Sequence, residues 1–468
     1  MQLPTKEHEL KQFLASLPAD KAATLAVAVE RDRLLGKPGM PADLILDGLR
    51  PVLRATGARR IPMPQRLVCE PFADFLINGP REFKQAGRIS RSSIRGLWRW
   101  LAKDGLRVTL AEFESQIAHA ILQRESKLQT DLVARLQSEI VAAVRMASGR
   151  AGEGATERRI FGVKFGGDDA LSDVEEMALL LSGANDLAPL RGLLPKRIDT
   201  LTEQHTSFVR DLYHQLAARR PELCPYVGLL VLSRLKRPWE ALRLATVMSR
   251  RSDETLFSRT DLGIVGDILL ADMEHLALDI ASVRPDMFDA EALLDKLDRF
   301  VQMSGGLVRE IGVRRDGKWG QRLIKIRQLA SDAMDALIAR APREITAALP
   351  VQKLGAFGGR GPRRPDLSRD PDASKVERAL LWGKLLAGST PYAGGGAFYS
   401  SHKTAFEEVS YYLRHYADSM VTELRTLEFD KRPRAQSFMA HAEALSDAVL
   451  GVEETDLMRR RAAAALTR

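Results

Sequence analysis

The stretch that decides the fold runs from Leu110 to Met146 and reads LAEFESQIAHAILQRESKLQTDLVARLQSEIVAAVRM. Its apolar residues recur mostly every three or four positions, at Leu110, Phe113, Ile117, Ile121, Leu128, Leu132, Leu136, Ile140 and Val144. This spacing places them on one face of an α-helix. At 1.5 Å per residue, a continuous helix over 110–146 would span roughly 55 Å.

The same stretch predicts a break near Arg124 to Lys127. Most of the apolar spacings are four, which exceeds the helical period of 3.6, so the apolar stripe drifts around the helix. The stripe is also interrupted between Ile121 and Leu128. We therefore expect a kink or break there, with the two halves packing on different neighbours.

Helical periodicity continues on both sides of this stretch. Near the N-terminus, Leu10, Phe13, Leu14 and Leu17 share one helical face. Asp316-Gly317 is a possible hairpin turn, but the residues from Trp319 to Leu337 keep helical spacing, which argues against a strand. No convincing strand pair is found. The sequence therefore predicts an all-α fold, a multi-helix array of packed antiparallel helices with no substantial β-sheet.

Three helical regions are expected. The first is residues 1–148 and includes the long helix over 110–146; the second is 168–350 and the third is 374–450. Residues 149–167, which are rich in glycine, and residues 355–373, which are rich in Gly, Pro and Arg, are predicted to be linkers. The second linker is expected to be poorly ordered, and trypsin is expected to cut first between Arg360 and Arg369.

Composition excludes several classes of protein. The chain has 468 residues, of which 45% are hydrophobic and 28% are charged, so wholesale disorder and collagen are excluded. Only two cysteines are present, which excludes a disulfide framework and a cysteine-built zinc site. The first residues are charged and lack the apolar core of a secretory signal, and the longest apolar run, Val227 to Leu232, is far short of a membrane span. The expected compartment is the cytoplasm.

Charge is distributed unevenly along the chain. The formal net charge is +9. Residues 81–107 carry +6, residues 309–327 carry +5 and residues 353–369 carry +4, whereas residues 253–300 carry −8. Such segregation carries information about binding partners.

The sharpest feature is the basic stripe, which we define as Arg91, Arg95, Arg99 and Lys103. A spacing of four places these residues on one side of a helix. The full set of candidate anion- or partner-binding residues adds flanking and linker residues: Arg88, Arg107, Arg360, Arg363 and Arg364. Three interpretations stay open for the stripe. It is solvated or pairs with the protein's own acidic segment 253–300; it contacts phosphate groups or an acidic protein; or its helix lies in a membrane surface.

No catalytic signature is found. The chain lacks the phosphate-loop, HExxH and GxSxG patterns, so we assign no catalytic residue and expect no cofactor. Asp211 with His214, and Asp272 with His275, have a spacing seen in di-iron helical bundles. Each pair falls on the polar side of its predicted helix, away from the core. We therefore expect no metal site.

Three functional hypotheses follow. The first is a non-enzymatic cytoplasmic scaffold or regulatory adaptor that binds an acidic protein partner. The alternative is a nucleic-acid-associated protein that uses residues 91–107 and the Arg-rich linker, although no aromatic residues lie among the linker arginines to stack on bases. The third is an enzyme whose site is assembled from residues dispersed in the sequence. The oligomeric state is left open.

Overall fold

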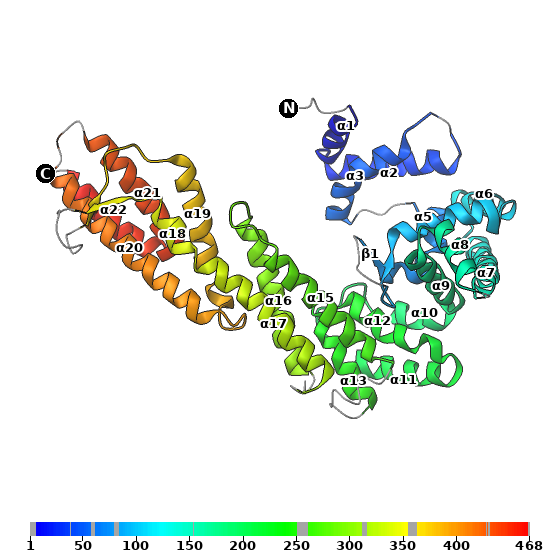
Figure 1. Cartoon of the computed structure of the whole chain (residues 1–468). Helices are drawn as coiled ribbons and strands as arrows, with labels where there is room; N and C mark the ends of the chain where they lie inside the picture. The colour runs from blue at the N-terminus through cyan, green and yellow to red at the C-terminus, as the bar shows by residue number, and fades with distance from the viewer. Residues whose placement is uncertain are drawn as a thin grey trace. The chain divides into compact units, whose positions relative to one another are not determined.

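The fold is all-α, as the periodicity predicts. The structure is a computed structural model that describes residues 6–37, 39–57, 61–78, 84–152, 154–249, 261–310, 316–353, 363–426, 428 and 431–466 (Figure 1). Helices make up 80% of it. In the described residues, strands are confined to the parallel pair β1 (Leu76–Ile77) and β2 (Ile89–Ser90) and the antiparallel pair β3 (Val351–Lys353) and β4 (Arg363–Pro365). The chain divides into two compact units, Met1–Lys236 and Arg237–Arg468.

The first unit is built from helices joined mostly by short turns. Its α-helices are α1 (Lys6–Ala15), α2 (Ala19–Leu34), α3 (Ala42–Thr56), α4 (Pro64–Val68), α5 (Arg91–Trp100), α6 (Thr109–Gln123), α7 (Ser126–Ala151), α8 (Ala155–Phe165), α9 (Asp168–Ser182), α10 (Ala184–Leu193), α11 (Glu203–Arg219) and α12 (Cys224–Arg234). Short 3₁₀ turns, η1 (Glu70–Phe75) and η3 (Pro221–Leu223), and one π-helical turn, η2 (Leu101–Gly105), complete it. Helices α1, α2 and α3 share an apolar cluster that includes Leu14, Val29 and Leu49.

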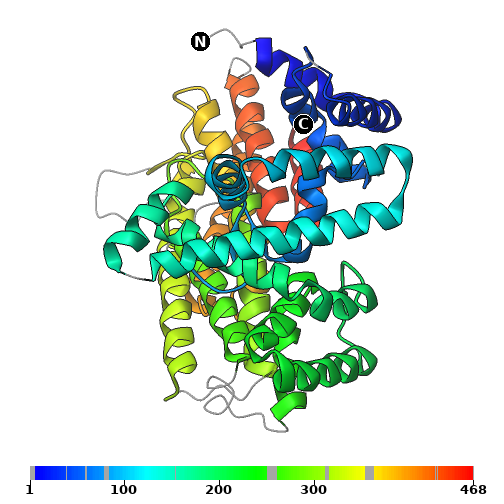
Figure 2. The same ribbon diagram turned by 90° about the vertical axis from the view of Figure 1, so that its right-hand side faces the viewer.

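The predicted break in the long helix is confirmed. Helix α6 ends at Gln123 and α7 begins at Ser126, with Arg124 in the left-handed conformation at φ 59°. The two helices lie side by side and run in opposite directions (Figure 2). Helix α6 also packs against α2, whereas α7 packs against α8 and α9. The interrupted apolar stripe therefore marks a helical hairpin, whose halves share α4 and η2 but also pack on different helices.

Arg124 provides a test of this turn. A left-handed conformation strains a residue with a Cβ, and glycine is preferred where a helix ends this way. The substitution Arg124→Gly is expected to raise the free energy of unfolding by up to about 1 kcal/mol, offset in part by the greater freedom of glycine in the unfolded chain. Urea denaturation measures the change. If the free energy of unfolding fell by about 1 kcal/mol or more, the left-handed conformation of Arg124 would be contradicted.

The glycine-rich segment 149–167, predicted as a linker, is largely helical. Helix α7 continues through Ala151, and α8 occupies Ala155–Phe165. Gly166 and Gly167 have φ values of 111° and 125°, which lets the chain turn sharply from α8 into α9. These two glycines therefore serve a tight connection between packed helices. The described chain also continues in a helix beyond residue 450.

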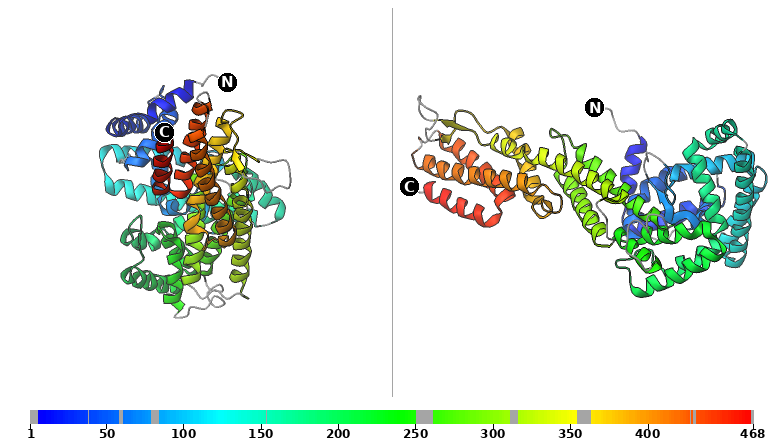
Figure 3. Two further views of the ribbon diagram at one scale, coloured as in Figure 1. Left: turned by 90° about the vertical axis from the view of Figure 1, so that its left-hand side faces the viewer. Right: turned by 60° about the horizontal axis from the view of Figure 1, so that its bottom comes forward.

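The second unit contains the remaining helices of the described residues. These are α13 (Leu242–Ser249), α15 (Gly263–Ala281), α16 (Ala290–Glu310), α17 (Lys318–Ile338), α18 (Ala341–Thr346), α19 (Ala373–Gly388), α20 (Tyr399–Thr426), α21 (Arg432–Leu450) and α22 (Val452–Leu466), with the 3₁₀ turns η4 (Pro238–Ala241) and η5 (Thr390–Tyr392). Helices α20, α21 and α22, orange to red, pack on one another (Figure 3, right).

The second predicted linker, 355–373, is described only from residue 363 onward. Residues 363–365 form β4. Arg434 on α21 holds the residues that follow: its Nε donates to Asp370 Oδ1 (2.6 Å), and its Nη1 donates to the carbonyl of Leu367 (2.9 Å). The remainder of the segment, including Arg360, lies outside the described residues. Early tryptic cleavage between Arg360 and Arg369 stays a prediction.

Candidate functional site

A buried polar cluster fixes the segment that leads into α5. Lys84 Nζ lies 2.8 Å from Asp173 Oδ1, bonds to Glu176 and donates to the carbonyl of Arg88 (3.0 Å). Both carboxylates come from α9 and are buried. The backbone N–H of Gly87 donates to Glu176 Oε1 at 2.5 Å. Lys84 and the backbone N–H of Gly87 thus offset the energetic cost of burying the two charged carboxylates.

The same cluster places the first turn of α5. Asp173 Oδ2 accepts hydrogen bonds from the backbone N–H of Ser90 (3.1 Å) and the hydroxyl of Ser93 (2.6 Å). From α12, the hydroxyl of Tyr226 donates to Glu176 Oε1 at 2.8 Å. Burial and then the charge of Glu176 raise the pKa of Tyr226, which keeps its phenol a proton donor. The start of α5 is therefore held at fixed points on α9.

Helix α5 is amphipathic, with one face buried against α8 and α9. Its buried side chains include Leu97 and Trp100. Gly96 allows the close crossing with α8, because a Cβ at this position would come within 2.6 Å of the carbonyl oxygen of Phe165. The buried face determines which side chains the helix presents outward.

The basic stripe lies on the outward face. Arg91, Arg95, Arg99 and Lys103 are all exposed, and so is Arg107. Among the described residues, none of these five side chains forms an ion pair. Arg88 differs, because it is half-buried and engaged by other residues.

Pairing of the stripe with the acidic segment 253–300, which belongs to the second unit, stays a prediction. Among the described residues of the second unit, that segment forms ion pairs with Lys296 of the segment itself, with Arg322 on α17 and with Arg378 on α19. Arg322 on α17 binds Glu274 on α15 (2.7 Å), and Trp319 Nε1 donates to Asp267 (2.8 Å). Because α15 and α17 pack along each other, these charges meet locally.

A π-helical turn follows α5 and positions the last residue of the stripe. The N–H of Leu106 bonds to the carbonyl of Leu101 at 2.7 Å, which spans five residues. In an α-helix, a step of four residues is longer than one turn of 3.6 residues. A π-helical turn contains more than 3.6 residues, so the step from Arg99 to Lys103 no longer exceeds one turn. The turn thus limits the drift of Lys103 away from the arginines.

The arginines of the second predicted linker belong to the second unit. Arg364 forms an ion pair with Glu423 on α20 (3.2 Å). Arg363 lies in β4, and Arg360 lies outside the described residues. Arg364 is therefore fixed by a carboxylate, because β4 packs against α20 and brings the two side chains together.

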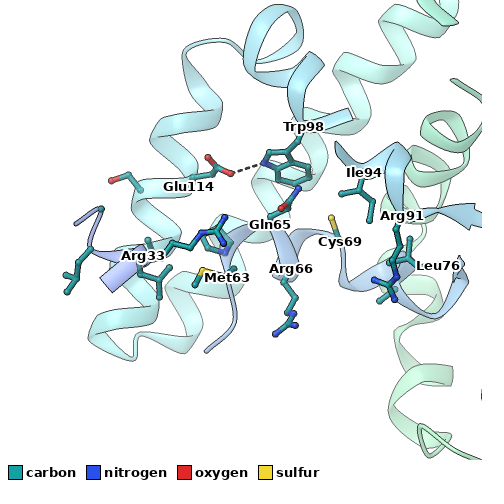
Figure 4. Close-up of a pocket in the computed structure, with 17 residues that line it drawn as sticks. Arg33, Met63, Gln65, Arg66, Cys69, Leu76, Arg91, Ile94, Trp98 and Glu114 are labelled. Carbon is teal, nitrogen blue, oxygen red and sulfur yellow. Dashed lines mark hydrogen bonds between the residues drawn. The ribbon is translucent and has the colours of Figure 1, made fainter. Parts of the chain in front are cut away.

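A cavity of about 820 Å³ lies beside α5 (Figure 4). Arg91, Ile94 and Trp98 from α5 line it. The other lining residues come from α2, α4, η1, β1 and α6 and from positions next to them: Arg33, Leu34, Leu35, Gly36, Met63, Pro64, Gln65, Arg66, Cys69, Ala73, Leu76, Glu114, Ser115 and Ala118. The indole Nε1 of Trp98 donates to Glu114 Oε1 at 2.8 Å, which fixes the ring. The volume of the cavity is within the range of small-molecule sites, roughly 300–1,000 Å³. We refer to it as the α5 cavity.

A second hollow, of about 580 Å³, lies at the start of α5. Asn78, Ser90, Ser92, Arg91 and Arg95 line it, along with residues near the start of α9. Hydroxyl, amide and guanidinium groups thus gather at a helix N-terminus, where partial positive charge favours anions, and the carboxylate of Asp169 lies beside them. Arg91 lines both hollows and connects them to the basic stripe.

Both cysteines are buried, and burial raises the pKa of the Cys69 thiol to about 12, so it stays protonated at neutral pH. Within the described ranges, no group of three or more His, Cys, Asp or Glu side chains is placed to hold a metal ion. In the same residues, no helix is long and apolar enough to cross a membrane.

The sequence predicted the stripe but not the two hollows. Trp98 is recognisable in the sequence only as an apolar helix position, and Gln65 and Glu114 carry no local signal. No protein family, curated protein or solved structure matches the chain. The functional argument therefore depends on the geometry of the first unit.

Proposed function

We propose that this protein binds nucleic acid through its phosphate groups, with the basic stripe of α5 as the main contact surface. The observation that carries the proposal is a row of exposed cations with no ion-pair partner among the described residues. Four residues along a helix advance roughly 6 Å, so the arginines form a regular line of donors. Arginine is well suited to phosphate because its planar fork donates two parallel hydrogen bonds.

The surroundings of the stripe favour a nucleic acid over a protein partner. Protein interfaces depend on exposed aromatic and apolar anchors at their centre. Among the exposed large apolar side chains of the described residues, none lies between positions 84 and 107; Val108 follows this segment, and Leu35 lines the α5 cavity with Arg91. Nucleic-acid interfaces are more polar and more positively charged. The hydroxyls of Ser90 and Ser92 beside Arg91 fit that description.

Salt dependence tests the proposal. Binding of a labelled DNA duplex, followed by fluorescence anisotropy, should weaken linearly on a logarithmic salt scale, with a slope of about −0.9 per phosphate contact. Replacing Arg95 and Arg99 with alanine should reduce that slope by roughly two, because two contacts are lost. Circular dichroism should show an unchanged helical content, since both side chains are exposed.

A charge-matched variant separates the stripe from net charge. Arg210, which is half-buried, and Lys236, which is exposed, lie in the same unit and pair with Asp211 and Asp199 respectively. Replacing both with alanine removes the same charge and should leave the slope unchanged. Equal effects of the two double variants, or no salt-dependent binding, would contradict the proposal.

A scaffold or adaptor that binds an acidic protein is the competing outcome. In that case a polyglutamate chain should bind more tightly than DNA at the same salt concentration, and Arg95→Ala/Arg99→Ala should abolish its binding. The measurement uses the same anisotropy titration with a labelled polyglutamate. Preferential binding of DNA would favour the phosphate proposal instead.

A further inference from the structure

We propose that the α5 cavity holds one unpaired base of a single-stranded nucleic acid whose phosphates lie along the basic stripe. This inference rests on the proposed function and adds the form of nucleic acid that the surface selects. It requires an aromatic face for stacking, a polar group for the base edge, and a cation at the mouth for the adjoining phosphate. The cavity supplies each of these.

Trp98 supplies the aromatic face. It lies on α5 between Arg95 and Arg99 in the sequence, lines the cavity and is half-buried. Its hydrogen bond to Glu114 holds the indole in one orientation (Figure 4). A base that stacks on a fixed ring loses less freedom than one that must first order the side chain.

Gln65 supplies the polar group. Its side chain points toward the indole of Trp98 from α4 (Figure 4). Among the described residues, its amide has no hydrogen-bond partner. An amide presents both a donor and an acceptor, which are the groups that base edges require.

Arg91 joins the cavity to the stripe. It lines the α5 cavity and also the hollow at the start of α5, and it is the first residue of the stripe. A strand whose phosphates follow Arg91, Arg95 and Arg99 therefore passes the mouth of the cavity. A duplex keeps its bases stacked inside, so only an unpaired base reaches Trp98 without the energetic cost of unpairing.

Tryptophan fluorescence gives a direct test on the unmodified protein. Of the five tryptophans, Trp98 is half-buried, whereas Trp100, Trp239, Trp319 and Trp382 are all buried. A short single strand of deoxythymidine should quench the emission on binding. A strand of the same length made of abasic sugar-phosphates, and a DNA duplex, should bind without quenching. Quenching of equal size by all three ligands, or none by deoxythymidine, would overturn the proposal.

Affinity gives a second, independent measurement. The single strand should bind roughly 5- to 150-fold more tightly than the abasic strand, which is the range for one stacked base. Trp98→Ala should remove that difference, and Trp98→Phe, which keeps a ring for stacking, should retain most of it. A difference that persists in Trp98→Ala would overturn the proposal.

The two proposals fail in different ways. If the abasic strand binds with a salt slope that Arg95→Ala/Arg99→Ala reduces, but the deoxythymidine strand gains nothing, the phosphate surface stands and the base site is overturned. If no strand binds at low salt, the proposed function fails and the base site fails with it. Because the wild-type measurements need no substitution, an unfolded Trp98 variant would not prevent this decision.

Discussion

Replacing Lys84 with methionine is expected to lower the free energy of unfolding of the first unit by about 3–5 kcal/mol, because it leaves two buried carboxylates without their cation. The Lys84 side chain is 18% exposed, and those of Asp173 and Glu176 are 0% and 6% exposed. Water therefore cannot replace the ammonium group. Urea denaturation followed by circular dichroism measures the loss.

The control for this prediction is Lys103→Met. It makes the same chemical change on an exposed side chain that has no ion-pair partner among the described residues, so its effect should stay within about 0.5 kcal/mol. Adding Asp173→Asn and Glu176→Gln to Lys84→Met should restore part of the stability, because neutral amides cost less to bury than charges. Equal effects of Lys84→Met and Lys103→Met would show that the cluster does not hold the fold.

Two adjacent glycines in α16 are expected to respond in opposite directions to alanine. A Cβ at Gly306 would lie 2.4 Å from the indole of Trp239, whereas a Cβ at Gly305 would meet nothing within 4 Å. Overpacking against a buried ring costs typically about 1–3 kcal/mol, partly offset in a helix by the better propensity of alanine. Gly306→Ala should therefore destabilise the second unit, and Gly305→Ala should stabilise it by up to about 1 kcal/mol.

Thermal unfolding of both variants provides the comparison. Both variants replace glycine with alanine in the same helix. The sign of the difference between their melting temperatures therefore reports on the contact with Trp239. A higher melting temperature for Gly306→Ala than for Gly305→Ala would mean that the indole moves aside without cost, contrary to the packing described.

The sequence predicted those features that depend on neighbours along the chain. The interrupted apolar stripe near Arg124 predicted the break between α6 and α7, because the buried face of a helix is encoded in local spacing, but it did not predict that the two helices pack on each other. The basic stripe was predicted in the same way, from the four-residue spacing of its members. Glycine content misled in 149–167, because composition does not distinguish a flexible linker from a tight turn between packed helices, such as the one at Gly166 and Gly167.

The features that depend on distant residues were not predicted. Lys84 meets Asp173 and Glu176 only after α9 folds back on the segment before α5. The α5 cavity needs α2, α4, η1 and α6 around Trp98, and no spacing in the sequence records that assembly. The ion pair between Glu274 of the acidic segment and Arg322 was also missed, since it depends on the packing of α15 against α17.

The burial of both cysteines has a practical consequence for chemical labelling. Cys69 and Cys224 are the whole cysteine content of the chain, and both are buried. A single cysteine introduced at the exposed position Ser92, beside Arg91, would then be the one readily accessible thiol. A maleimide dye would attach there without removal of either native cysteine. The surface that we assign to phosphate binding can thus be fitted with a reporter in one substitution.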